Sequence, residues 1–329
     1  MMNSMVIIEQ MLVICLLILV GAFLYRKKLL TDTGAGQISF LIVHVTNPAI
    51  MLSTAISEEE VIPAAEIGQA FALAVAAYAL SALAGFLITL LLRSKAGERI
   101  AIIMMTMYPN VGFIGIPLVL ATLGTRAMVY VTVNNLVYSV LFYTTGIPLI
   151  RMAATMSGAN PDTGAKKPKS ADLRHNILKG LLHTGTVSAF LSILIYLTHP
   201  AVPSVISDPL LYAGRCTTFL SMLVLGVSVA GSPLASYRTD RKTWIFILLR
   251  GIVSPVIVAL ILSPFIRDAV LRDAVLLLVA VPSGSLPMIV SREQGLDDHV
   301  FARGIILSTL VSPVTIPLAM TLFHLILMR

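Results

Sequence analysis

The chain has 329 residues, of which 57% are hydrophobic and only 12% are charged. Soluble domains carry about 25% charged residues, so this chain has more apolar surface than one core can bury, and the excess must face lipid. The net charge of +7 comes from short basic blocks between apolar runs, which is typical of cytoplasmic loops and argues against nucleic acid as a partner. The composition therefore predicts an integral protein of the lipid bilayer.

The first apolar run, 6–25, has no basic residue before it and is followed by Arg26, Lys27 and Lys28. A cleavable signal peptide has the opposite order, with positive charge ahead of the apolar run. We therefore expect a permanent first span.

Ten runs are long and apolar enough to cross a bilayer as helices, which takes about 20 residues. They are 6–25, 37–57, 67–92, 100–122, 127–150, 177–198, 209–231, 243–265, 274–291 and 304–327. The runs are too long and too uniformly apolar for the alternating strands of a β-barrel. We predict an all-α membrane protein with ten transmembrane helices.

Lysine and arginine are concentrated in every second loop. The odd loops carry most of them, whereas the second loop has none and contains Glu58, Glu59 and Glu60. By the positive-inside rule the odd loops are cytoplasmic and both termini lie outside. This pattern predicts a multi-pass protein of the cell (inner or plasma) membrane.

The longest polar stretch, Ser157 to Lys179, has the composition of a linker. We assign residues 1–153 to a first half of five spans, 154–176 to a cytoplasmic linker and 177–329 to a second half of five spans. An odd number of spans in each half gives the halves opposite orientations, which predicts two inverted repeats.

The fourth and ninth runs are interrupted near their middles. They read Tyr108-Pro109-Asn110-Val111-Gly112-Phe113-Ile114-Gly115-Ile116-Pro117 and Val281-Pro282-Ser283-Gly284-Ser285-Leu286-Pro287. Such backbone is tolerated at membrane depth only where it lines a cavity or is covered by protein. Matched interruptions predict a transporter site at crossed, broken helices, with crossover or hinge residues Pro109, Gly115, Pro117, Pro282 and Pro287. Two proline-kinked structural helices are the alternative.

Each break would create helix N-termini with unsatisfied N–H groups and positive partial charge, which can hold a carboxylate without a buried lysine. The candidate substrate ligands at the breaks are Asn110, Gly112, Ser283, Gly284 and Ser285.

Two further spans carry polar residues. Asn47-Pro48 in the second run is either a cavity-lining hinge or a local kink. Asn134 and Tyr138 in the fifth run share a helix face and either contact the substrate or bond a neighbouring helix.

Few ionisable residues fall inside the runs. Glu9 is the one acidic residue, so the central carboxylate that coupled carriers often use is missing. Arg250 either contacts the substrate, which we favour, or reaches the near surface, which we favour for Arg215. His44 is either proton-sensitive, and then a possible coupling residue, or bonded to a neighbouring helix.

Cys15 and Cys216 lack the spacing of a metal or redox site, so we expect neither metal nor cofactor. No HExxH motif or membrane-depth aspartate pair is present, and we therefore expect no enzyme and no catalytic residues.

The chain resembles the auxin efflux carrier family, which includes bacterial organic-anion permeases, linked to malonate or malate, and plant PIN-type auxin exporters. The resemblance covers nearly the whole chain, and its motifs are Asn47-Pro48, Pro109-Asn110 with Gly115-Ile116-Pro117-Leu118, Pro282 to Pro287, and Ser308-Thr309 through Pro317. It departs from many plant members in its short central loop and in the absence of ionisable residues from 67–92.

The resemblance implies a scaffold domain of spans one, two, six and seven, often a homodimer. Spans three to five and eight to ten would form a transport domain that moves like an elevator, with the substrate near Asn110, Asn134 and Tyr138.

These features predict a secondary transporter for a small organic anion, a carboxylate such as malonate or malate or an auxin-like acid. The inside-negative potential favours uncoupled export. Backbone carbonyls at the breaks could bind a cation, so a sodium- or proton-coupled symporter similar to bile-acid symporters is one alternative, and an anion channel is another.

Overall fold

The computed structural model describes residues 4–58, 62–156, 178, 181–232, 241–293 and 299–327. All regular elements in these ranges are helices, so the predicted all-α class is confirmed. Seven helical segments are long and apolar enough to cross a membrane: Ile8–Arg26, Asp32–Ile56, Ala64–Leu91, Met128–Met152, Ser204–Ala230, Arg241–Phe265 and Val300–Leu327. The chain is therefore a multi-pass membrane protein by length and composition of its helices, whereas the count of ten spans and the inverted repeats stay predictions.

The other three predicted spans are shorter or interrupted. The fourth consists of α5 (Ala96–Met107) and, after a gap, η2 (Val111–Gly115) with α6 (Ile116–Leu123). The ninth consists of α15 (Ala269–Ala280) and α16 (Leu286–Glu293), and in place of the sixth the structure has α10 (Thr184–Thr198). Most of the predicted linker 154–176 lies outside the described residues, which resume after 156 only at 178.

Seven predicted spans correspond to long helices, three of which have internal irregularities. The bounds are α1 Ser4–Arg26; α2 Asp32–Leu41, η1 Ile42–Thr46 and α3 Asn47–Ile56; α4 Ala64–Leu91; α7 Met128–Leu141, η3 Phe142–Gly146 and α8 Ile147–Met156; α11 Ser204–Ala230; α13 Arg241–Leu248, η5 Leu249–Val253, α14 Ser254–Leu262 and η6 Ser263–Phe265; and α17 His299–Leu327.

Four π-helical turns share one sequence cause. The turns η1, η2, η3 and η5 each end two residues before a proline, and these prolines are Pro48, Pro117, Pro148 and Pro255. Proline lacks an N–H and its ring crowds the carbonyl four residues earlier. A wider turn at this point lets the helix continue past the proline.

Two details of the predicted breaks differ in the structure. Asn47-Pro48 lies within a helix that runs continuously from Asp32 to Ile56 through η1, and its role as a hinge or a local kink stays a prediction. Gly115, Pro117 and Pro287 also lie inside helices, since the non-helical residues are 108–110 and 281–285. Pro287 is the second residue of α16, where a missing N–H costs no helical hydrogen bond, whereas Pro117 follows the π-helical turn η2 within a continuous helix.

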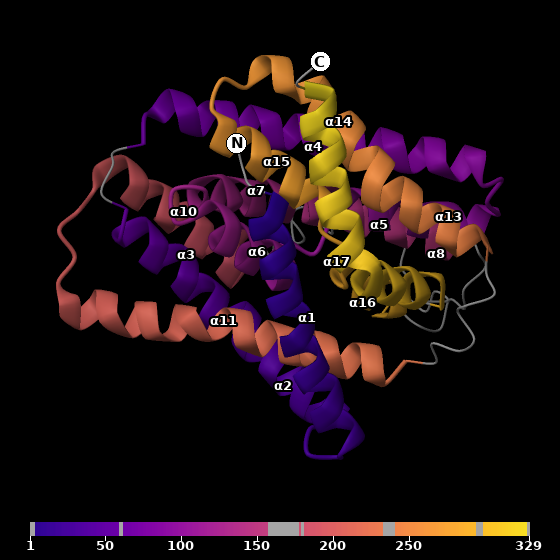
Figure 1. Cartoon of the computed structure of the whole chain (residues 1–329), viewed down its shortest axis with the longest axis horizontal. Coiled ribbons are helices and arrows are strands. Elements are labelled where there is room, and N and C mark those ends of the chain that lie inside the picture. Colours follow the sequence, from indigo (N-terminus) through magenta and orange to yellow (C-terminus); the bar gives the residue numbers. More distant parts are fainter. Residues whose placement is uncertain are drawn as a thin grey trace.

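By their contacts the helices can be described as two groups that touch each other; Figure 1 shows how α11 crosses α1 and α2. In one group, α11 packs along α1 and against α2 and α3, and α10 packs against α3. In the other, α4 packs against α5, α7 and α14, and α17 packs against η5 and α15. Contacts of α10 with α7 and of α1 with α17 join the two groups, and their assignment as a scaffold and a transport domain stays a prediction.

Glycine allows α1 and α11 to touch backbone to backbone. A Cβ at Gly226 would lie 2.2 Å from the carbonyl oxygen of Ile18, and one at Gly21 would lie 2.4 Å from that of Leu223. Small residues at helix crossings are the usual way in which membrane helices approach this closely.

Gly226→Ala is therefore expected to lower stability by about 1–3 kcal/mol, the usual effect of overpacking. The measurement is the heat-induced loss of the monodisperse species in detergent. Gly68→Ala on α4 is the matched control, because a Cβ at Gly68 meets nothing within 4 Å. Equal stability of the two variants would show that the α1–α11 contact is looser than described.

Candidate functional site

The two interrupted helices meet where each leaves the helical conformation. The N–H of Asn110 donates to the carbonyl of Pro282 at 2.8 Å, and the N–H of Gly284 donates to the carbonyl of Tyr108 at 2.9 Å. Pro109 and Ser283 thereby form an antiparallel bridge. Proline breaks leave backbone groups without helical partners, and this pairing satisfies them within the protein.

Glycine at position 284 allows this close approach without displacement of the opposite segment. A Cβ there would lie 3.1 Å from the carbonyl oxygens of both Tyr108 and Pro109. Both oxygens are backbone atoms of the opposite segment, which is itself held by the paired hydrogen bonds. The glycine in the ninth span therefore sets how closely the two breaks pack.

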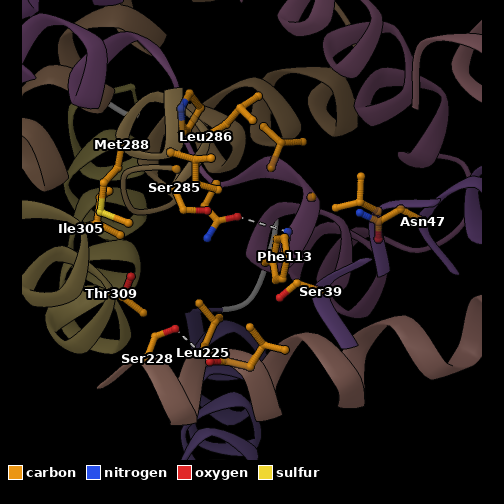
Figure 2. A pocket seen from close by; sticks show the side chains of 18 of the residues that line it. Ser39, Asn47, Phe113, Leu225, Ser228, Ser285, Leu286, Met288, Ile305 and Thr309 are labelled. Carbon is orange, nitrogen blue, oxygen red and sulfur yellow. Dashed lines mark hydrogen bonds between the residues drawn. The ribbon is translucent and has the colours of Figure 1, made fainter. Parts of the chain in front are cut away.

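A cavity of about 700 Å³ lies beside the paired segments. Figure 2 shows Asn47 and Phe113 on one side of it, Ser285, Leu286 and Met288 on another, and Leu225 and Ser228 of α11 below. Ile305 and Thr309 of α17 also line it. The cavity thus lies between the helices of both packing groups.

The lining is mostly apolar, and its polar residues are uncharged or histidine. Among the described residues that line it, none is Asp, Glu, Lys or Arg. The polar ones are Ser39, Asn47, Asn110, Asn135, Tyr138, Ser139, Tyr143, His183, Ser228, Ser232, Ser285 and Thr309. Such a surface suits an organic molecule with a small polar end.

The first turn of η2 presents hydrogen-bond donors to the cavity. Asn110 caps it: the side-chain Oδ1 accepts from the N–H of Phe113 at 3.2 Å. The N–H of Val111 donates to the carbonyl of Pro109 at 2.9 Å, which leaves the N–H of Gly112 free in the described structure. Because Oδ1 of Asn110 is already an acceptor, the N–H groups of the same amide remain available as donors.

Asn47 lies over this helix end. A Cβ at Gly112 would be 3.0 Å from Nδ2 of Asn47, so the glycine makes room for the amide. Asn47, Asn110 and Gly112 all line the cavity. Together they form a group of donors at the positive end of a helix dipole.

The N-terminus of α16 is a second helix end with free N–H groups at the cavity. Ser285, Leu286 and Met288 line the cavity, and no hydrogen bond from their N–H groups is present in the described structure. The two helix N-termini are held together by the pairing of the breaks. Anions bind readily at such ends because free N–H groups and the dipole act together.

Seven of the predicted site residues line this cavity. Those that line it are Asn47, Pro109, Asn110, Gly112, Tyr138, Gly284 and Ser285. Pro282 does not line it and instead supplies the carbonyl that accepts from Asn110. Pro48 lies in the helix beyond Asn47.

Asn134 and Ser283 are placed differently. Asn134 is buried and accepts a hydrogen bond from the Tyr78 hydroxyl at 2.9 Å, whereas its neighbour Asn135 lines the cavity. Consecutive residues of a helix point about 100° apart, and here the side chain at 135 faces the cavity while that of Asn134 faces Tyr78 of α4. Ser283 is fully buried, and its N–H donates to Oγ of Ser308 at 3.3 Å.

Arg250 does not line the cavity either. Its side chain is 1% exposed, with Nε 3.2 Å from the carbonyl of Met105 and Nη1 3.3 Å from that of Val279. The predicted alternatives of substrate contact and surface exposure both fail in this structure.

His44 lies one layer outside the cavity. Its Nδ1 is 3.0 Å from Oγ1 of Thr184, as expected for a bond to a neighbouring helix. Its ring lies 5.7 Å from that of His183, which does line the cavity and was not singled out from the sequence. Nδ1 of His183 accepts from the N–H of Gly185, so the proton of the neutral ring is on Nε2, which is then a donor.

The sequence-based conclusion that Glu9 is the one acidic residue inside the helical spans is wrong. Asp273 lies within α15, is 3% exposed and has Oδ1 3.1 Å from Nε2 of His324 on α17. The predicted ninth span began at 274, whereas α15 begins at Ala269, so this carboxylate was counted as part of a loop.

The profile of a protein family described as "membrane transport protein" matches residues 6–320. The chain is therefore a membrane transport protein, and this class agrees with the expectation that it is not an enzyme. It belongs to the auxin efflux carrier family, as the motif resemblance indicated. A search of curated proteins finds no match.

Proposed function

We propose that this protein is a secondary transporter for organic anions that binds a carboxylate at the paired breaks and moves it by an elevator mechanism. The main support is the convergence of uncharged donors on one cavity. The N-termini of η2 and α16, the amides of Asn47 and Asn110 and the ring of His183 all meet there. This arrangement attracts an anion without a lysine or arginine at the contact surface.

The size and lining of the cavity favour an acid with an apolar body. About 700 Å³ is within the usual range for small-molecule pockets, about 300–1,000 Å³. Phe113, Leu225 and Ile305 offer apolar contacts around the donor group. Malonate or malate would leave most of this surface unused, so an auxin-like monocarboxylate fits it better.

The lining residues that lie near predicted cytoplasmic loops suggest which state the structure represents. Ser228 and Ser232 lie just before 233–240, Met288 and Ala302 flank 294–298, and His183 follows the predicted linker. These segments belong to the loops predicted to be cytoplasmic. We propose that this is the inward-facing state, and that α4–α8 and α13–α17 move against α1–α3, α10 and α11 to reach the outward-facing one.

The ten-span arrangement follows the same proposal. The two interrupted helices occupy the fourth place in each half, as two inverted repeats require. The scaffold group would form the homodimer contact, as in related carriers of this family.

A proton-coupled symporter is the second candidate, and Asp273 supports it. A carboxylate that is 3% exposed and 3.1 Å from a histidine nitrogen can take up and release a proton during transport. The two candidates differ in what drives uptake.

Uptake of labelled indole-3-acetate, malonate and malate into proteoliposomes tests the proposal. A membrane potential, a pH gradient and a sodium gradient are imposed in turn. Saturable flux driven by voltage alone is expected, with a lower KM for indole-3-acetate than for the dicarboxylates. Flux that needs a pH gradient and is lost in Asp273→Asn would establish the second candidate. Absence of saturable flux for all three acids would refute the carboxylate site.

A further inference from the structure

Arg250 is a buried cation that the proposed transport reaction does not yet use. It is the largest of the fully buried side chains and lies in the π-helical turn η5. Nε donates to the carbonyl of Met105 at 3.2 Å, and Nη1 donates to those of Val279 at 3.3 Å and Ala280 at 3.5 Å. Nη2 has no hydrogen-bond partner in the described structure.

The three carbonyls that accept hydrogen bonds from Arg250 all lie at C-terminal ends of helices. Met105 lies in the last turn of α5, and Val279 and Ala280 end α15. The last carbonyls of a helix have no helical partner and carry the negative end of its dipole. One guanidinium therefore joins the C-terminal ends of the two half-helices that precede the breaks, and its planar fork of donors suits this task better than an ammonium group.

No carboxylate balances this charge in the described part of the chain. The ion pairs described there are Arg126 with Glu66 and His324 with Asp273, and neither includes Arg250. Because burial of an unpaired cation is costly, its retention in a lipid-embedded helix group suggests a functional role.

The cavity is lined by the same interrupted helices that Arg250 contacts. Met105 is four residues before Pro109 and Ala280 is four residues before Gly284, and both Pro109 and Gly284 line the cavity. An anion at the N-termini of η2 and α16 and the guanidinium of Arg250 would therefore be held by the same pair of interrupted helices.

We propose that Arg250 is the positioning residue whose buried charge is balanced by one negative charge of the substrate across the paired breaks. The inference rests on the proposed anion transport. It predicts that the charge of Arg250 moves with α4–α8 and α13–α17. When these helices move with a bound monoanion (the loaded step), the two charges cancel. When they move back without substrate (the empty step), the positive charge of Arg250 is uncompensated.

The consequence is a specific voltage dependence. One charge crossing 100 mV corresponds to about 50-fold in an equilibrium, or about sevenfold in a rate if half of this energy acts on the barrier. Removing the charge of Arg250 adds one uncompensated negative charge to the loaded step. In wild type and variant alike, a complete cycle still moves one substrate charge across the membrane, because the charge of residue 250 returns in the empty step.

The experiment compares exchange and net flux of labelled indole-3-acetate in proteoliposomes at 0 and −100 mV. For exchange, saturating unlabelled acid is present on both sides, so only loaded steps occur. From wild type to Arg250→Gln, the response of the exchange rate to voltage is expected to change by up to about sevenfold, the limit reached when the loaded step that voltage slows determines the rate. Arg215→Gln is the matched control, because Arg215 is an exposed arginine on α11 in the other packing group.

A second pair of variants keeps the guanidinium in place. Ser254 is buried, lies four residues after Arg250 and has an unpartnered Oγ. Ser254→Asp adds a compensating charge and is expected to reproduce the voltage response of Arg250→Gln, whereas Ser254→Asn has the same size and is expected to behave as wild type. This pair applies even if Arg250→Gln fails to fold.

Arg250→Lys separates charge from geometry. It is expected to keep the wild-type voltage response and KM while lowering the maximal rate, because an ammonium group cannot span both helix ends. Equal voltage responses of wild type, Arg250→Gln and Ser254→Asp would overturn the inference and leave the proposed function standing. Wild-type flux without saturation would instead count against the proposed function.

Discussion

Asn110→Ala is expected to lower kcat/KM for the transported acid at least tenfold. The substitution removes an amide that lines the cavity and whose N–H groups remain free to donate. A hydrogen bond to a charged group contributes about 1.5–3 kcal/mol, which corresponds to about 10-fold to 150-fold. Uptake into proteoliposomes at several acid concentrations measures this loss.

The same side chain also caps η2, and this second role needs a control. Loss of an N-cap costs about 1 kcal/mol of stability. Asn110→Asp keeps the acceptor for the N–H of Phe113 and so preserves the cap, but it places a negative charge at the cavity. We expect Asp to retain wild-type thermal stability and to lose transport at least as completely as Ala. Normal saturable transport by either variant would remove the paired breaks from the binding site.

Gly284→Val is expected to reduce the transport rate more than tenfold without preventing membrane insertion. Its Cβ would lie 3.1 Å from the carbonyl oxygens of Tyr108 and Pro109, and its methyl groups would separate the two breaks. The hydrogen bonds Asn110–Pro282 and Gly284–Tyr108 would lengthen, and the two helix N-termini would no longer converge. Flux per correctly inserted protein is the measurement.

A graded series makes this result specific. Gly284→Ala is expected to give an intermediate rate, since the Cβ alone requires a shift of only a few tenths of an ångström. Gly68→Val, where a Cβ meets nothing within 4 Å, is expected to transport as wild type. A normal rate for Gly284→Val would mean that close pairing of the breaks is not needed for transport.

The positions of the breaks were predictable from local sequence, because proline and glycine act on the backbone wherever they occur. The helices end at Met107 and Ala280, next to the predicted Pro109 and Pro282. The width of the breaks was overestimated. A π-helical turn lets the helix continue past Pro48 and Pro117, and Pro287 lies at the second position of α16, where proline is harmless.

Whether an individual side chain faces the cavity, the protein interior or lipid was much harder to predict. Lipid is as apolar as a protein interior, so the helical periodicity of apolar residues does not separate the buried face from the lipid face. The sequence therefore offered no basis for choosing between Asn134 and Asn135, and it gave no indication that His183 reaches the cavity. Arg250 shows the same difficulty, because its partners are backbone carbonyls, which every residue has.

By itself the sequence determined that this protein lies in a membrane, that it is helical, where two of its helices break and, through its motifs, which family it belongs to. Only the tertiary structure decided that the breaks pair with each other, which polar residues share the cavity, and that one arginine joins the two helix ends behind it. The physical reason is the range of the interactions. Hydropathy and backbone geometry act over a few neighbouring residues, whereas the contact between Asn110 and Pro282 depends on the packing of the whole helical assembly.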